Sequence, residues 1–210
     1  MEENMRLNRS RRSSKVQGVI GFHGLSDWWL GTFSDRERKH IQACYQPYGS
    51  PGNTLTQGTF ETSQSACSLL SGVPGFLEYP QDLPLARKFF QKAEEIGSRD
   101  ILDMHFLYLA EIRIFYRQRN NDPDALREAI EACKKQIQIA PQAAMAFEKT
   151  EYIDRIPAHT GYKQLAIIYD KQGRYEEAVE LSRQAKTQGW DGDWDRRIER
   201  LHKKLKRQSK

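Results

Sequence analysis

Apolar residues recur at spacings of three and four along most of the chain, which is the pattern of helices that bury one face. The clearest such stripe consists of Leu85, Ala86, Phe89, Phe90 and Ala93. It predicts a helix over residues 82–96, and Gly97 is placed to end that helix because glycine tolerates the backbone conformation found there. The next segment, 101–116, is apolar on nearly every side, so we expect a helix enclosed by its neighbours.

The rest of the chain predicts further helices separated by turns rich in glycine and proline. Ser34 and Glu37 have the spacing of a capping box, so a helix is expected over residues 35–45. More helices are expected over residues 66–72, 123–139, 143–149, 160–171, 174–188 and 194–206. Residues 46–63 are rich in Pro, Gly, Ser and Thr and predict a long loop. Together these segments predict an all-α fold.

One pair of these helices carries a specific set of aromatic and small residues. They are Tyr162, Leu165, Ala166, Tyr169, Gly173, Tyr175, Ala178 and Ala185. In residue type and spacing they resemble the tetratricopeptide repeat, a hairpin of two antiparallel helices. Ala166 and Ala178 are small enough for the two helices to approach closely, and Gly173 suits the tight turn between them. Trp190 departs from the motif, which usually has proline at that place.

The second half of the motif recurs twice upstream in a weaker form. The matching sets are Leu83, Ala86, Phe90 and Ala93, and then Leu126, Ala129, Cys133 and Gln136. The corresponding alanines, Ala86, Ala129 and Ala178, lie 43 and 49 residues apart, whereas a standard repeat has about 34 residues. This difference indicates insertions near residues 119–122 and 142–159. Any amphipathic helix pair places alanine and leucine at such spacings, and this alternative stays open, above all for the first set.

The resemblance implies a right-handed α-solenoid of about three helical hairpins, with an N-terminal helical extension and a C-terminal capping helix. The chain is divided accordingly into a basic flexible arm (1–17), a helix and loop extension (18–62), a repeat domain (63–192) and a basic capping helix with its tail (193–210). A stack of repeats needs a polar terminal helix to cover its last apolar face, and the final segment meets that need.

Tetratricopeptide proteins generally bind a partner protein in a concave groove lined by the first helix of each repeat, so the resemblance implies a non-enzymatic adaptor, scaffold or accessory subunit. Carried over by position, the groove residues are Leu107, Glu111, Ile114, Phe115, Lys163, Ile167, Asp170 and Lys171. Some members of the family clamp a C-terminal carboxylate with paired lysines and asparagines. Lys163 fits one of those places, but Ile167 stands where an asparagine belongs. We therefore expect a helix or an extended segment as the ligand.

The net charge of +5 is concentrated at the two ends of the chain. Residues 196–210 include eight lysines and arginines against one glutamate, residues 1–15 include five against two, and residues 16–195 carry a net charge of −5. The basic residues expected on the last helix are Arg196, Arg197, Arg200, Lys203, Lys204 and Arg207. An alternative function is therefore a subunit of a nucleic-acid-associated complex whose basic termini contact phosphates. Simple solvation of the tail is the other interpretation.

The sequence shows no pattern of catalytic, cofactor-binding or metal-binding residues. The five histidines are scattered, and no metalloprotease, nucleophile-elbow or phosphate-loop motif is present. Cys44, Cys67 and Cys133 are far apart, which favours free thiols in a reducing cytoplasm. No apolar run approaches the ~20 residues of a membrane helix. We therefore expect a cytoplasmic protein that has no membrane partner, no cofactor and no enzymatic activity.

Two aromatic features need a structural assignment. His105 lies in the apolar segment 101–116, where the expected role is a buried, hydrogen-bonded core histidine and not a base or a metal ligand. Trp28 and Trp29 form an adjacent pair near the N-terminus. Such a pair is either part of a core or an exposed anchor for a partner protein, and the sequence leaves both interpretations open.

Overall fold

A computed structural model describes residues 16–47, 49, 52–150 and 155–208. Apart from one isolated β-bridge between Ala158 and Asp191, the regular structure of these residues is helical, which confirms the predicted all-α class. Most of the predicted basic arm lies outside the described residues. The described chain forms two compact units, residues 16–66 with 76–78 and residues 67–75 with 79–208, and each is described by itself.

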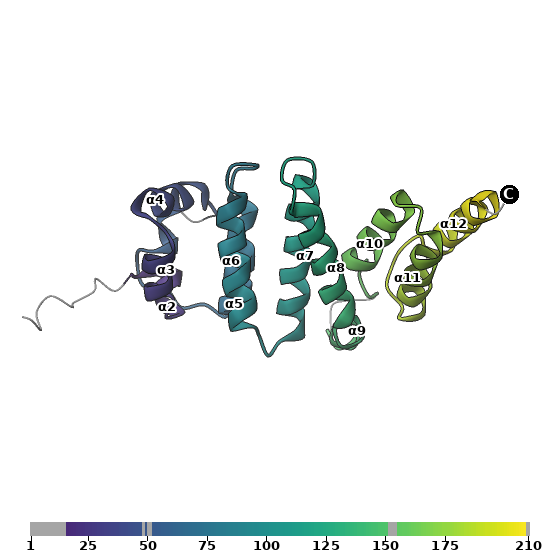
Figure 1. Cartoon of the computed structure of the whole chain (residues 1–210). Coiled ribbons are helices and arrows are strands. Elements are labelled where there is room, and N and C mark those ends of the chain that lie inside the picture. The colour runs from purple at the N-terminus through teal and green to yellow at the C-terminus, as the bar shows by residue number, and fades with distance from the viewer. Residues whose placement is uncertain (1–15, 48, 50–51, 151–154, 209–210) are drawn as a thin grey trace, which may run out of the picture. The chain divides into compact units, whose positions relative to one another are not determined.

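The helices keep close to the predicted bounds and are labelled in Figure 1. The first unit contains α2 (Gly18–Phe22), α3 (Ser26–Thr32), α4 (Asp35–Cys44) and the 3₁₀ turn η1 (Gly52–Leu55). The remaining elements, which belong to the second unit except for Ala66 and Phe76, are α5 (Ala66–Gly72), η2 (Val73–Phe76), α6 (Leu83–Ile96), α7 (Ile101–Gln118), α8 (Ala125–Gln138), α9 (Ala140–Glu148), α10 (Thr160–Lys171), α11 (Tyr175–Thr187) and α12 (Trp194–Gln208).

The first unit shows one confirmed signal and two elements that the sequence did not predict. The capping box is present, since the Ser34 hydroxyl accepts a hydrogen bond from the Glu37 amide at 3.3 Å and the Glu37 carboxylate accepts one from the Ser34 amide at 2.7 Å. Helices α2 and α3 have only five and seven residues, too few to show a repeated apolar spacing. Leu55 in η1 is fully buried, so the predicted loop contributes to the core.

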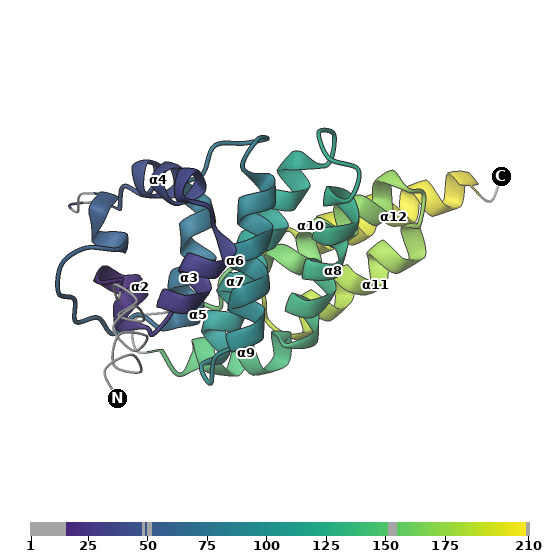
Figure 2. The same cartoon turned by 60° about the vertical axis from the view of Figure 1, so that its left-hand side comes forward.

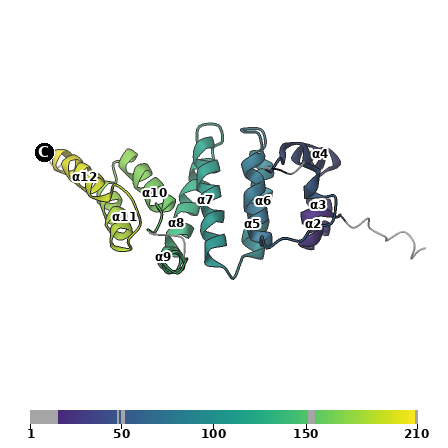
Figure 3. The same ribbon diagram turned by 180° about the vertical axis from the view of Figure 1, so that it is seen from behind.

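In the second unit, consecutive helices pack as antiparallel hairpins. Helices α7 and α8 lie side by side in opposite directions (Figures 1 and 2), and α10 and α11 form the next pair (Figure 3). Helix α10 contacts both helices of the preceding hairpin, and α12 packs on α11. Each hairpin therefore buries an apolar side of its neighbour.

Small residues set the close approach of α10 and α11. Ala166 and Ala178 are buried in one cluster with Val179 and with Leu201 of α12. Gly173 has φ +76° at the turn between the two helices, a conformation that glycine adopts without strain. Helix α12 thus covers the apolar surface that the last hairpin would otherwise expose.

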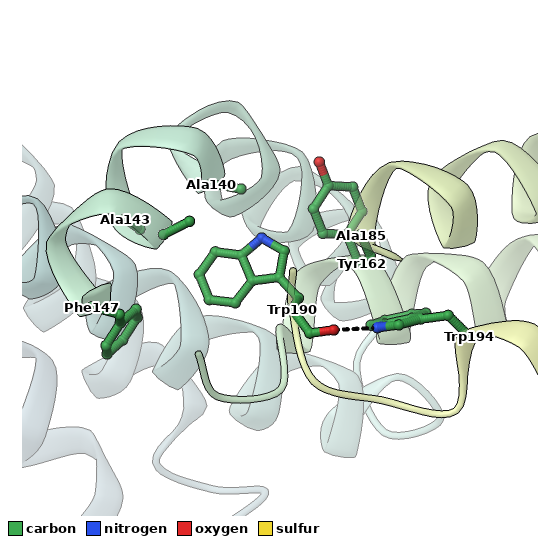
Figure 4. Packing of buried hydrophobic residues seen from close by; sticks show 8 residues of the cluster. Ala140, Ala143, Phe147, Tyr162, Ala185, Trp190 and Trp194 are labelled. Carbon is green, nitrogen blue, oxygen red and sulfur yellow. Dashed lines mark hydrogen bonds between the residues drawn. The ribbon is translucent and has the colours of Figure 1, made fainter. Parts of the chain in front are cut away.

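Trp190 packs against the residues that precede α10. Its indole is 2% exposed and lies in a cluster with Ala140, Ala143 and Phe147 of α9 (Figure 4). The Trp194 ring nitrogen donates a hydrogen bond to the Trp190 carbonyl oxygen at 2.7 Å. The extra residues before α10 therefore include a short helix that packs against this indole.

Candidate functional site

Helix α7 reaches solvent along one side. It contacts α6, α8, α9 and α10, and its exposed residues are Phe106, Arg113 and Arg117. They are separated by seven and four residues, so they share one side of the helix. Phe106 keeps 49% of its surface exposed, which is unusual for a large aromatic residue in the middle of a packed bundle.

The α7 residues predicted to line a groove lie elsewhere on this helix. Leu107, Glu111 and Phe115 are buried, and Ile114 is half-buried. Glu111 and Phe115 instead line a hollow of about 490 Å³ between α6, α7 and α8. The register carried over from the repeat therefore does not select the solvent-facing side of α7, because this apolar helix has no polar stripe to mark that side.

The hollow beside Glu111 is rich in charges that mostly neutralise one another. Lys135 pairs with Glu94, and Arg87 at the rim pairs with Asp122 at 2.7 Å. Burial raises the pKa of the Glu111 carboxyl well above its ordinary value, the negative charge of Glu94 raises it further, and Lys135 opposes the rise. Glu111 is thus held in a setting that favours its protonated, neutral form.

On α10 the solvent-facing side includes three of the predicted residues. Lys163 and Lys171 are exposed and Ile167 is half-buried between them. Asp170 has a different role, since its carboxylate pairs with Lys204 of α12 at 2.5 Å and lies 3.7 Å from Arg200. Asp170 therefore anchors the C-terminal helix.

Helices α7 and α10 run parallel, and their exposed sides lie next to each other. At one end, the rings of His105 and His159 are 5.2 Å apart, and at the other the Lys171 ammonium donates to the Tyr116 hydroxyl at 3.2 Å. Helix α8 contacts both helices and so covers them from the other side. We call the shared exposed side the basic face; its residues are Phe106, Arg113, Arg117, Lys163, Ile167 and Lys171.

The charge of the basic face is of one sign. In the two helices, which are described in full, each exposed charged residue is a lysine or an arginine. Within the described residues, no ion pair joins Arg113, Arg117 or Lys163 to an acid. Asp193 lies within the field of Lys163, but its carboxylate pairs with Arg197 at 3.3 Å. The basic face thus carries cations that have no acidic partner among the described residues.

Much of the predicted basic stripe on α12 is already engaged. Arg197 is 5% exposed, Arg200 and Lys204 face Asp170, and Lys203 pairs within α12 at 2.6 Å. The two predicted residues that are exposed and have no ion pair among the described residues are Arg196 and Arg207. The basic character of α12 therefore serves packing as well as solvation.

Two histidines and two cysteines of the second unit are buried titratable groups whose pKa values are shifted by burial. Burial lowers the pKa of His105 to about 4 and that of His159 to about 3, so both rings are neutral near pH 7. Burial raises the pKa of the Cys67 thiol to about 11 and that of Cys133 to about 12. His105 is in the core as expected, but its Nδ1 has no hydrogen-bond partner. Such sealed groups lack the access to substrate that a base or a nucleophile needs.

The tryptophan pair belongs mainly to the core of the first unit. Trp29 is 1% exposed, and its ring lies 5.1 Å from that of Phe33. Trp28 is half-buried and meets Phe33 edge to face at 5.3 Å. Of the two interpretations left open by the sequence, the core role fits these contacts.

The basic face remains as the main exposed feature that packing within the second unit does not explain. Among the described residues, no helix combines the length and the apolar character needed to cross a membrane. No protein-family model, no curated protein and no solved structure matches the chain.

Proposed function

We propose that this protein is a non-enzymatic adaptor or accessory subunit that binds a partner protein on the basic face. In this proposal, α7–α8 and α10–α11 are successive tetratricopeptide-type hairpins of a right-handed α-solenoid. Helix α6 belongs to a degenerate first repeat, and α12 is the cap. The observation that carries the proposal is that α7 and α10, the first helices of their hairpins, run parallel and share an uncovered side.

Apolar side chains on that side favour a protein partner. Phe106 is 49% exposed and Ile167 is half-buried among the lysines. Aromatic residues are enriched in protein interfaces, where a few anchors carry most of the binding energy. Covering the exposed half of such a ring contributes about 1 kcal/mol, so Phe106 can act as an anchor together with the charges around it.

Affinity capture from cell lysate with a matched pair of variants tests this proposal. Phe106→Asp places a charge on the basic face, whereas Ile96→Asp makes the same change at an exposed position at the end of α6, where the side chain is 41% exposed. We expect Phe106→Asp to lose the protein that the wild type captures and Ile96→Asp to retain it. Equal capture by all three chains would contradict the proposed binding surface.

The nucleic-acid alternative has a narrower basis. It rests on Arg196 and Arg207, the predicted α12 cations that stay exposed and free of ion pairs among the described residues. Phosphate contacts make binding strongly dependent on salt. Replacing both arginines by alanine and measuring retention on single- and double-stranded DNA against salt tests the C-terminal part of this alternative, and unchanged retention removes these two residues as phosphate contacts.

A further inference from the structure

We infer that the segment bound by the basic face is acidic and carries apolar side chains between its carboxylates. This inference rests on the proposed function and names the chemistry of the partner. Four cations, Arg113, Arg117, Lys163 and Lys171, are exposed on two adjacent parallel helices, and Phe106 and Ile167 lie on the same side. A ligand that satisfies both kinds of side chain must offer negative charge and apolar surface together.

The second helices of the hairpins show what the basic face lacks. On α8, Arg127 pairs with Asp124 at 2.9 Å and Lys134 pairs with Glu131 at 2.7 Å. There the exposed cations have acids three residues away. The basic face has no such acids, although residues 16–195 as a whole carry a net charge of −5. On α7 and α10 the exposed charge is therefore positive only, although residues 16–195 are acidic overall.

The spacing of the cations also points to a ligand. Arg113 and Arg117 are four residues apart on α7, and like charges at this spacing repel each other. An acidic ligand lying across them removes that repulsion and gains two charge-assisted hydrogen bonds. The arrangement is thus less favourable in the free protein than in a complex with a carboxylate-bearing chain.

Interleaved apolar residues favour an acidic peptide over a nucleic acid. Nucleic-acid surfaces combine phosphate-binding cations with aromatic residues on which bases stack, whereas the basic face has one aromatic residue, Phe106, at one end of its exposed stripe. Ile167 lies between Lys163 and Lys171, where it suits an aliphatic side chain of a peptide. We therefore place nucleic acid among the outcomes of the test.

The size of the surface sets the length of the probe. From Phe106 to Arg117 the exposed stripe covers about 16 Å at 1.5 Å of rise per residue. An extended peptide covers that length with about five residues. Probes of about ten residues therefore span both α7 and the neighbouring α10.

Fluorescence polarisation with four labelled probes and the full chain tests the inference. The probes are an acidic peptide with interspersed leucines, the same peptide with serine for leucine, the same peptide with lysine for each acid, and a single-stranded oligonucleotide of equal length. We expect the acidic–leucine peptide to bind at least about tenfold more tightly than each of the others, and to weaken as salt rises.

A charge swap supplies the control. The Arg113→Glu/Arg117→Glu variant is expected to lose the acidic–leucine peptide by about tenfold or more and to gain affinity for the lysine–leucine peptide. The Arg127→Glu/Lys134→Glu variant, with the same charge change on α8, should behave as wild type. The four substituted positions are exposed, so we expect both variants to fold. Thermal unfolding checks this.

Two results would overturn the inference. One is tighter binding of the oligonucleotide than of the acidic–leucine peptide, which would make the basic face a phosphate surface. The other is an order of affinities that does not depend on the charge of the peptide, or one that the Arg113→Glu/Arg117→Glu substitution leaves unchanged. Capture of the native partner could still require Phe106 while the charge swap leaves that capture unchanged. This result would support the proposed function and contradict the inference that the partner is acidic.

Discussion

His105 and His159 meet Trp190 where α7 and α10 come together. The His105 ring stacks on the indole at 5.6 Å with an angle of 7°, and the His159 ring approaches it edge-on at 4.5 Å. His105 Nδ1 and His159 Nε2 are buried without a hydrogen-bond partner in the described structure. A neutral ring tolerates such surroundings at moderate cost, but a charged ring does not. These two residues therefore make the seam between the hairpins sensitive to acid.

Stability should fall as the pH drops below 6.5. Both folded-state pKa values, about 4 and about 3, lie below the ordinary value of 6.5, so the unfolded chain binds protons first. Each histidine should remove roughly 2 kcal/mol of the free energy of unfolding between pH 8 and about pH 5. Urea denaturation across this range measures the loss.

Substitution locates the source of that acid sensitivity. His159→Asn keeps an acceptor for the Tyr162 amide, which now donates to His159 Nδ1 at 3.2 Å, but removes the titration. We expect it to flatten the pH dependence by about half. An unchanged pH dependence in this variant would contradict the assignment.

Glu111 gives the opposite pH dependence. Its pKa in the folded protein is raised above the ordinary 4.5, first by burial and then by Glu94, so the folded state favours the protonated carboxyl. Stability from this group is therefore lost as the pH rises above 4.5. Glu111→Gln should raise the free energy of unfolding by about 1–2 kcal/mol at pH 8 and change it little near pH 5.

An exposed glutamate on the next helix provides the comparison. Glu131→Gln, at a side chain that is 51% exposed, should change stability by less than about 0.5 kcal/mol at either pH. Denaturation curves at the two pH values distinguish the cases. If Glu111→Gln destabilises the protein at pH 8, the folded state is stabilised by the ionised carboxylate, which would contradict this prediction.

At the scale of elements, one glutamine side chain connects three helices through hydrogen bonds. The Gln136 side chain of α8 donates to the His105 carbonyl of α7 at 2.9 Å and accepts from the Gly161 amide of α10 at 2.7 Å. Gly161 lacks a side chain at the point of closest approach. A Cβ there would lie 2.9 Å from the Gln136 amide oxygen and 3.0 Å from the Cys133 carbonyl oxygen. The packing of α10 on α8 therefore depends on this glycine.

Gly161→Ala should push the two hairpins apart. The cost is expected to be about 1–3 kcal/mol, because the alanine methyl overpacks a seam that includes backbone atoms. Gly72→Ala is the matched control, since a Cβ at this helical glycine meets open space, and it should be neutral or slightly stabilising. Thermal unfolding of both variants provides the comparison, and a neutral Gly161→Ala would contradict the described seam.

Element positions could be read from the sequence wherever the apolar spacing or a cap was strong. The predicted bounds of the helices containing Phe89 and Leu165 agree with α6 and α10 to within a residue. Helices α2 and α3 could not be predicted, because elements of five and seven residues show no period. Leu55 was missed for a related reason: an apolar residue with polar neighbours on both sides gives no pattern, although the folded chain buries it completely.

The two helices of the candidate site differ in how far the sequence determines them. On α10, the alternation of Lys163, Ile167 and Lys171 with buried leucine and alanine marks the solvent side. On α7, the exposed stripe begins with Phe106 and the buried side contains Glu111, which reverses the usual relation between polarity and exposure. The contacts of α7 with four neighbouring helices decide its orientation, and a single-helix pattern does not contain that information.

At the scale of the whole molecule, stacking of hairpins in the second unit leaves a surface that the chain does not use for its own packing. Helix α8 covers α7 and α10 from one side, and α12 covers the last hairpin through Leu201 and the pairing of Lys204 with Asp170. Of the cations of the basic face, Lys171 donates to Tyr116 between the two helices, whereas Arg113, Arg117 and Lys163 form no ion pair among the described residues. Their position on one shared side is what connects the fold to the proposed binding role.

Mapping the bound acidic–leucine peptide by amide NMR on the full chain tests that connection most directly. Saturable shifts are expected for Arg113, Arg117, Lys163, Ile167 and Lys171, with α8 and the outer side of α11 unchanged. Shifts confined to α8, α11 or α12, or none at peptide concentrations that saturate the polarisation signal, would contradict the assignment of the basic face as the binding surface.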